Sequence, residues 1–122
     1  MIRKYLASDY DEVMSWLDAR GMKKIHSRIL PENGFIIPGI GAVWIYKTDS
    51  DICFIEELYS NPKAESKREH IDQLIMVAIE AAKEMGFKFI QSVTSHPSII
   101  KRAVLLGAKI ETLQTLITLQ IK

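Results

Sequence analysis

The chain has 122 residues, of which 48% are hydrophobic and 25% charged, and its formal net charge is +1. This length suits one domain over residues 1–122, and the composition excludes a disordered chain. A net charge near zero gives no support to a nucleic-acid or membrane role. The single Cys53 cannot form an internal disulfide, and no apolar run is long enough to cross a bilayer. The N-terminus lacks the pattern of a signal peptide, so we expect a cytoplasmic protein.

The first third of the chain predicts a strand followed by a helix. Residues 2–6 have the pattern of a short strand, and Ser8 with Asp11 three residues later predicts the start of a helix. Gly21 is the expected end of that helix. The next segment, residues 22–34, is ambiguous and could hold a second short helix.

The middle of the chain predicts three strands and a long helix. The strands are expected at residues 34–37, 42–46 and 52–59, joined by links short enough for antiparallel hairpins. The helix over residues 66–85 has the clearest periodicity, because its apolar side chains form one stripe and its charged side chains face elsewhere. Gly86 supplies the left-handed residue that ends it.

The last third predicts a strand over residues 88–94, a helix over 97–106 and a long strand over 109–121. The unit of strand, helix and strand from residue 52 to residue 94 should form a parallel crossover. The expected fold class is therefore α/β, with a mixed central sheet of about six strands and helices on both faces.

Three phrases of the sequence carry a resemblance to one superfamily. EELYSNP before a long helix resembles the strand, loop and helix that bind acetyl-CoA in the GNAT (Gcn5-related N-acetyltransferase) superfamily. AAKEMGFKFIQSV resembles the usual helix end and next strand of that superfamily, and SHPSIIKRAVLLGAKI resembles its later helix. GFIIPGIGAVWIYKTDSD and SNPKAE are similar to small GNAT-like proteins of bacteriophages. The resemblance covers residues 2–110 and is strongest from residue 52 onwards.

The resemblance implies a GNAT-like acyl-CoA N-acyltransferase fold and an acetyl-CoA-dependent transfer to an amine of a small molecule or a protein. In that chemistry a base, often a Glu on a central strand, takes a proton from the amine directly or through water. Glu56 and Glu57 end the strand that would line the site, so one of them is the candidate base. Because adjacent strand residues point to opposite faces, we expect only one to face the site. The alternative is that either one is solvated or paired with a Lys.

The resemblance also implies which residues would bind the cofactor. The strand backbone at Leu58, Tyr59 and Ser60 would pair with the pantetheine arm, and the pyrophosphate would lie at the following helix start. The candidates for the phosphate groups are Lys63, Ser66, Lys67 and Arg68.

The glycine-rich phosphate turn of the family is missing. Its Arg falls near Ser66, and its two glycines fall near Glu69 and Ile71. Residues 66–69 have instead the form of a capping box, in which Ser66 and Glu69 use backbone amides that would otherwise face pyrophosphate. Two interpretations stay open, a purely structural helix start and a phosphate site built from basic side chains.

The acid that protonates the leaving thiolate is also replaced. Many GNAT members have a Tyr four residues before the glycine that ends the later helix, and this chain has Ala103 there. His96 lies near the family's Asn position and could donate the proton, because the pKa of imidazole is near 7. The alternative is that His96 only begins the helix.

Two further expectations concern the remaining residues and a second function. His26, His70 and His96 show no metal-ligand spacing, so no metal site is expected. Cys53 is expected to be a buried structural thiol. The missing glycines, the capping box and Ala103 favour an alternative function, a catalytically inactive GNAT-fold protein that binds another protein or itself as a homodimer.

Overall fold

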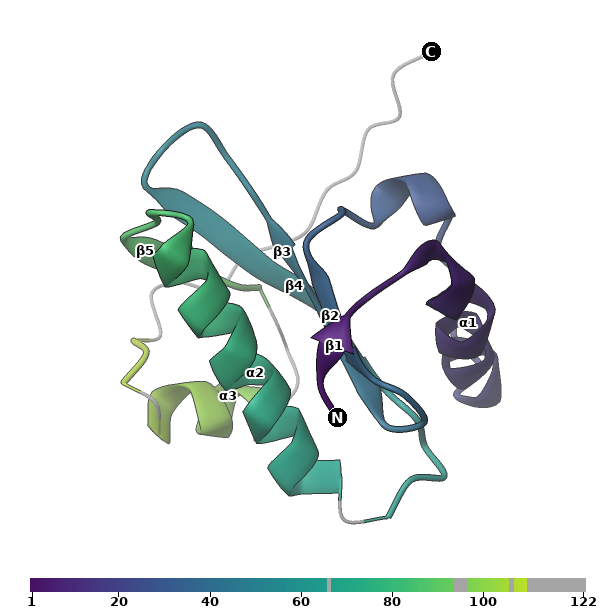
Figure 1. Ribbon diagram of the computed structural model, residues 1–122. Helices are drawn as coiled ribbons and strands as arrows, with labels where there is room; N and C mark the ends of the chain where they lie inside the picture. The colour runs from purple at the N-terminus through teal and green to yellow at the C-terminus, as the bar shows by residue number, and fades with distance from the viewer. Residues whose placement is uncertain (66, 94–96, 106, 110–122) are drawn as a thin grey trace. The chain divides into compact units, whose positions relative to one another are not determined.

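The computed structural model describes residues 1–65, 67–93, 97–105 and 107–109, which fall into two compact units, Met1–Ser92 and Val93–Lys122. A single domain over the whole chain stays a prediction. The first unit contains the sheet and two helices (Figure 1), namely β1 (Arg3–Lys4), α1 (Tyr10–Ala19), β2 (Gly34–Ile37), β3 (Gly41–Tyr46), β4 (Ile52–Ser60), α2 (Lys67–Glu84) and β5 (Phe89–Gln91). The described part of the second unit contains α3 (Pro97–Leu105). None of the described helices is both long and apolar enough to cross a membrane.

The sheet has the strand order β1-β2-β3-β4-β5. Neighbouring strands are antiparallel from β1 to β4, and β4 and β5 are parallel. The predicted hairpins and the predicted crossover through α2 are therefore confirmed, as is the mixed α/β class. The described residues form five strands, and the predicted final strand over residues 109–121 lies outside the described part except at residue 109. The ambiguous segment 22–34 contains one 3₁₀ turn, Ser27–Ile29.

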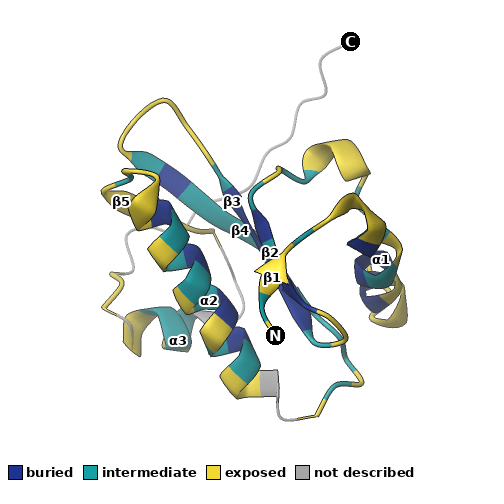
Figure 2. Cartoon of the chain, viewed as in Figure 1, coloured by how far each residue is buried: buried dark blue, intermediate teal, exposed yellow. Residues whose placement is uncertain are grey.

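The two faces of the sheet are covered by different helices, because α1 and α2 lie on opposite sides (Figure 1). Alternation along β3 separates two cores, since Val43 and Ile45 face α2 whereas Ala42 and Trp44 face α1. Figure 2 shows that the buried residues of each helix lie on its side nearest the sheet. Cys53 is fully buried against α2, as expected for a structural thiol.

The start of α1 differs from the prediction. The chain makes a 3₁₀ turn at Ala7–Asp9, and α1 begins at Tyr10 without a side-chain cap from Ser8. Asp9 holds this turn, since its carboxylate accepts a 2.8 Å hydrogen bond from the Leu6 amide and bonds of 2.7 and 2.8 Å from the Arg3 guanidinium. These contacts lower the pKa of Asp9 below its usual range, and the hydrogen bond from Arg3 is the main cause.

The Asp9→Asn variant is expected to be less stable than the unchanged protein at pH 7, with a difference that shrinks as the pH falls. The folded pKa of Asp9 lies below its unfolded pKa of about 3.9. The ionised carboxylate therefore stabilises the fold above that pH, and this contribution is lost as the pH falls through the folded pKa. Thermal unfolding between pH 7 and pH 2 measures the effect, with Ser8→Ala as a control that leaves stability unchanged. A difference independent of pH would contradict the role of the Asp9 charge.

Candidate active site

Strand β4 contains a β-bulge in the middle of the sheet. Ala42 of β3 lies opposite Tyr59, but Trp44, two residues later, lies opposite Glu56, three residues earlier. Strand β4 therefore has one extra residue here, which disrupts the ladder locally. Within the described residues, Glu57 is the only non-glycine residue with a positive φ, at 58°. This conformation costs roughly 1–2 kcal/mol for most side chains, and such strain is concentrated at functional sites.

The bulge brings both glutamates to the same side of the sheet. Glu56 lies opposite Trp44, whose side chain packs against α1, so Glu56 belongs to that face. The Glu57 carboxylate accepts a hydrogen bond from the hydroxyl of Tyr59, which also packs on the α1 face. The expectation that the two glutamates point to opposite faces is therefore wrong, because the extra residue breaks the alternation of β4.

Burial and charge make Glu57 more basic than an ordinary glutamate. Removal from water raises the pKa of Glu57 above its usual range, and the negative charge of Glu56 adds to the rise. The hydrogen bond from Tyr59 favours the ionised form and opposes this rise, but burial prevails. A carboxyl group with a raised pKa has the property that a general base needs near neutral pH.

Tyr46, the last residue of β3, is a member of the same group of side chains. Burial raises the pKa of Tyr46 to about 12, with further contributions from the charges of Glu57 and Glu56. Its hydroxyl oxygen is buried and has no hydrogen-bond partner among the described residues. No local pattern in the sequence indicates Tyr46 as a site residue, because its relation to Glu57 depends on the bulge and on the pairing of β3 with β4.

The pairing of β4 with β5 is short in the described part of the chain. Strand β5 pairs only with Ile52–Phe54, so no described strand pairs with residues 55–60 on this edge. An extended ligand that carries amide groups can pair with the edge of a strand through backbone hydrogen bonds, as a neighbouring strand does. Of the residues predicted to bind the cofactor arm, Leu58 packs on the core beside α2 and Tyr59 bonds to Glu57.

Ser60, the third of these residues, is held by a side chain that the sequence analysis missed. The Arg20 guanidinium, just after α1, donates a 3.2 Å bond to the Ser60 carbonyl and a 2.9 Å bond to its hydroxyl. Forty positions separate the two residues, and no local pattern in the sequence indicates the contact. Arg20 therefore links the end of α1 to the end of β4.

The loop after β4 is fixed by Asn61. The Asn61 side chain donates a 2.9 Å hydrogen bond to the Gly39 carbonyl and accepts a 3.0 Å bond from the Lys63 backbone amide. The backbone amide of Asn61 donates to the Ile40 carbonyl at 2.8 Å. The Ala64 amide donates in turn to the Asn61 carbonyl at 3.2 Å. Three backbone amides of this loop, those of Asn61, Lys63 and Ala64, are thus engaged within the protein, which differs from a phosphate-binding nest of free amides.

The remaining predicted residues are only partly placed. Lys63 lies in the loop before α2 and Arg68 in the first turn of α2, and both residues are exposed. Helix α2 begins at Lys67, whose side chain is outside the description, and Ser66 and His96 lie outside the described residues. The predicted capping box, which needs Ser66, and the predicted role of His96 both stay predictions.

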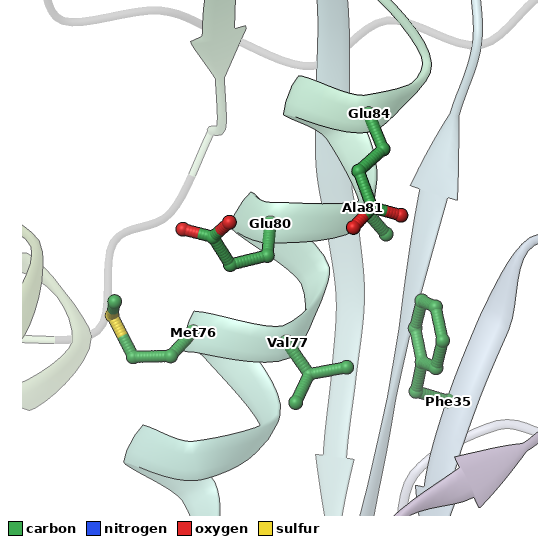
Figure 3. Close-up of a pocket in the computed structure, with 6 residues that line it drawn as sticks. All are labelled: Phe35, Met76, Val77, Glu80, Ala81 and Glu84. Carbon is green, nitrogen blue, oxygen red and sulfur yellow. The ribbon is translucent and has the colours of Figure 1, made fainter.

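A separate groove of about 340 Å³ lies on the other side of the sheet, between β2 and α2 (Figure 3). It is lined by Phe35, Met76, Val77, Glu80, Ala81 and Glu84. Phe35 packs with the core beside α2, whereas the bulge glutamates lie on the α1 face, so the groove is not part of the glutamate site. No group of three or more His, Cys, Asp or Glu side chains in the described ranges is placed to bind a metal ion.

The sequence matches no protein-family model and no curated protein, but solved structures resemble the fold closely. An acetyltransferase of the GNAT family from Streptococcus pneumoniae has a TM-score of 0.73 at 14% identity, over 98% of each chain. An acetyltransferase from Trypanosoma brucei has a TM-score of 0.71 at 15% identity, over 98% of this chain and 99% of that one. N-acetylglutamate synthase from Neisseria gonorrhoeae, complexed with coenzyme A and N-acetyl-glutamate, has a TM-score of 0.67 at 16% identity, over 85% of this chain and 27% of the synthase.

Proposed function

Because the chain has the fold of the GNAT acetyltransferases, we propose that it transfers an acyl group from acyl-CoA to an amine and that Glu57 is the general base. The observation that carries this proposal is the bulge of β4. It places a carboxyl group with a raised pKa beside an open strand edge, and it keeps that group in a strained backbone conformation. The fold alone would not support a function, since the same fold can carry different activities.

The proposed role of Glu57 is to take the proton that the amine must lose. An acyl thioester, when bound, would supply an activated carbonyl carbon, to which the amine nitrogen bonds as the C–S bond breaks and CoA leaves as a thiolate that takes up a proton from water. The Glu57 carboxylate accepts the proton of that nitrogen directly or through a water molecule. Tyr59 orients the carboxylate through its hydrogen bond, and Glu56 keeps the pKa of Glu57 raised through its negative charge.

The described residues fit acyl-CoA better at one end than at the other. The edge of β4 beyond Phe54 fits an extended arm that carries amide groups, because β5 ends its pairing with β4 at that residue. At the phosphate end, the Lys63 and Ala64 amides already have partners within the protein. We therefore expect the side chains of Lys63 and Arg68 to contribute most of the phosphate binding.

The cofactor part of the proposal is tested by thermal unfolding with acetyl-CoA or CoA at millimolar concentration. A ligand with a micromolar dissociation constant, at about a thousandfold excess, stabilises the folded state by about 4 kcal/mol. Pantetheine, which lacks the phosphates, should give a smaller shift, and Lys63→Ala with Arg68→Ala should reduce the CoA shift towards that of pantetheine. Absence of any shift with CoA would overturn the proposal.

The second candidate function is a non-catalytic GNAT-fold module that binds another protein or a second copy of itself. One observation favours it, namely that two loop amides near the expected phosphate position are used within the protein. The same titration separates the two functions, since this module predicts no shift with CoA. Sedimentation over a range of concentrations then tests for a homodimer, and a monomer at all concentrations would contradict self-association.

A further inference from the structure

We propose that copies of the chain associate head to tail, with the exposed basic segment of residues 22–29 of one copy docked in the groove between β2 and α2 of the next. The segment is rich in Lys and Arg, and the carboxylates of Glu80 and Glu84 line the groove. Both surfaces lie outside the glutamate site, so this contact does not depend on the proposed acyl transfer.

The floor of the groove is apolar. Phe35 on β2 and Val77 on α2 face each other across it, and Ala81 lies one turn further along the helix (Figure 3). Met76 and Glu80 extend on the outer side of α2, where 43% of Met76 is exposed. A second chain bound here would therefore remove apolar surface from water, which favours association.

The charges that line the groove are negative. Glu80 and Glu84 are its charged residues, both are exposed, and neither forms an ion pair with a described residue. Lys83, the neighbouring cation of α2, lines a second groove on the β5 side of the helix. Lys4 of β1 lies opposite Phe35 but is not among the residues that line the groove. A surface with exposed cations and exposed apolar side chains is complementary to this groove.

Residues 22–29 form a surface with these properties. Its exposed cations are Lys23, Lys24 and Arg28. None of the three forms an ion pair with a described residue. Two apolar side chains of the segment are exposed as well, Met22 by 48% and Ile29 by 57%. Figure 2 shows that the 3₁₀ turn at the end of the segment is exposed along its whole length.

The segment of one copy cannot fill its own groove. Ile25 and Leu30 pack on the core beside α1, whereas Phe35 packs on the core beside α2, and the two helices cover opposite faces of the sheet (Figure 1). A contact between the two surfaces therefore needs two copies. Because the two surfaces differ, a pair formed in this way leaves one groove and one segment free, and association continues beyond a dimer.

Sedimentation over a range of protein concentrations tests the contact. The unchanged protein should form species larger than a dimer as its concentration rises. This association should weaken between about 0.1 M and about 1 M salt, because the Debye length falls from about 10 Å to about 3 Å. Glu80→Lys with Glu84→Lys reverses the charge of the groove and should raise the dissociation constant about tenfold or more, as should Lys23→Glu with Lys24→Glu in the segment.

A mixture of the two charge-reversed variants is the decisive measurement. Each variant alone has two surfaces of like charge, but in the mixture every basic surface can meet an acidic one, so association should return. The matched control is Asp49→Lys with Asp51→Lys, which changes the net charge equally in the exposed turn between β3 and β4. This control should associate as the unchanged protein does.

A monomer at every concentration would overturn the inference, as would an association that stops at a dimer. Charge-reversed variants that associate normally, or a mixture that does not recover association, would overturn it too. The shift of thermal unfolding by CoA should be the same in all these variants, so a failure of the contact leaves the proposed function in place. The salt dependence and the remaining variant test the inference even if one variant does not fold.

Discussion

Replacing Glu57 with glutamine is expected to lower kcat/KM for acetyl transfer by about 10²- to 10⁴-fold, the usual contribution of a general base. The amide of the introduced glutamine would be close in shape to the carboxyl group and could still bond to Tyr59, so the loss would come from the missing proton acceptor. Steady-state kinetics with acetyl-CoA and the best amine measure it. Glu56→Gln is the matched control and should reduce kcat/KM much less. Equal activity in the Glu57→Gln variant would remove Glu57 from the proposed chemistry.

The pH dependence of the same reaction should follow the pKa of Glu57. Because the base must be ionised, kcat/KM is expected to rise with pH through a pKa above the usual glutamate value of about 4.3. Glu56→Gln removes a negative charge that raises this pKa, so its rise in activity should lie at lower pH. A shift to higher pH in this variant would contradict the assignment.

The raised pKa of Glu57 should make the protein less stable as the pH rises, which is the opposite of the pH dependence expected from Asp9. Its folded pKa is raised, so the native state retains a proton that the unfolded state has lost, and stability falls as the pH rises through the window between the two pKa values. Glu57→Gln is therefore expected to be at least as stable as the unchanged protein at pH 7 and to lose this advantage below about pH 4, where both states of the unchanged protein hold the proton. This result would separate a loss of activity from a loss of folding.

Replacing Trp44 with alanine is expected to lower the free energy of unfolding by about 3–5 kcal/mol, the usual cost of removing a large buried aromatic side chain. Trp44 is fully buried, and its ring packs edge-on against Tyr5 at 4.9 Å and Tyr59 at 6.1 Å between ring centroids. A domain of this size has a total stability of about 5–15 kcal/mol, so the variant would retain only part of it. Urea unfolding followed by circular dichroism measures the difference.

Trp44→Phe is the matched variant and should cost clearly less than Trp44→Ala. It retains an aromatic ring against Tyr5 and Tyr59, and it loses no hydrogen bond because the indole nitrogen of Trp44 has no partner in the described structure. An equal cost for the two variants would contradict this account. Trp44→Ala should also lower activity, because Tyr59 would lose the ring contact that positions its hydroxyl to donate to the Glu57 carboxylate.

Much of the fold could be predicted because the decisive patterns are local. The apolar stripe of α2, the short links that join β2, β3 and β4 as antiparallel hairpins, and the glycine after α2 each reflect a local pattern, and the structure confirms them. The short turn at Ala7–Asp9 was missed because Asp9 has its partner in Arg3, six residues earlier, and not in the helix that follows.

The candidate site could be predicted only in part. The two glutamates were identified from their place at the end of a strand, but their orientation was not, because a positive φ is usually indicated by Gly or Asn and Glu57 is neither. Tyr46 and Arg20 were missed because strand pairing and a contact across forty positions bring them to the site. Whether Ser66, Lys67 and His96 contribute stays a prediction.

The extra residue of β4 shifts the phase of the strand. Before the bulge, even-numbered residues such as Phe54 and Glu56 face α1, whereas after it the odd-numbered Tyr59 does so. Counting positions across this point therefore gives the wrong face for one half of the strand. Deleting Glu57 would restore regular alternation only by removing the proposed base itself. The extra residue that reverses which side chains of β4 face α1 is therefore the proposed base itself. A relative whose strand lacks this residue would need a base at another position.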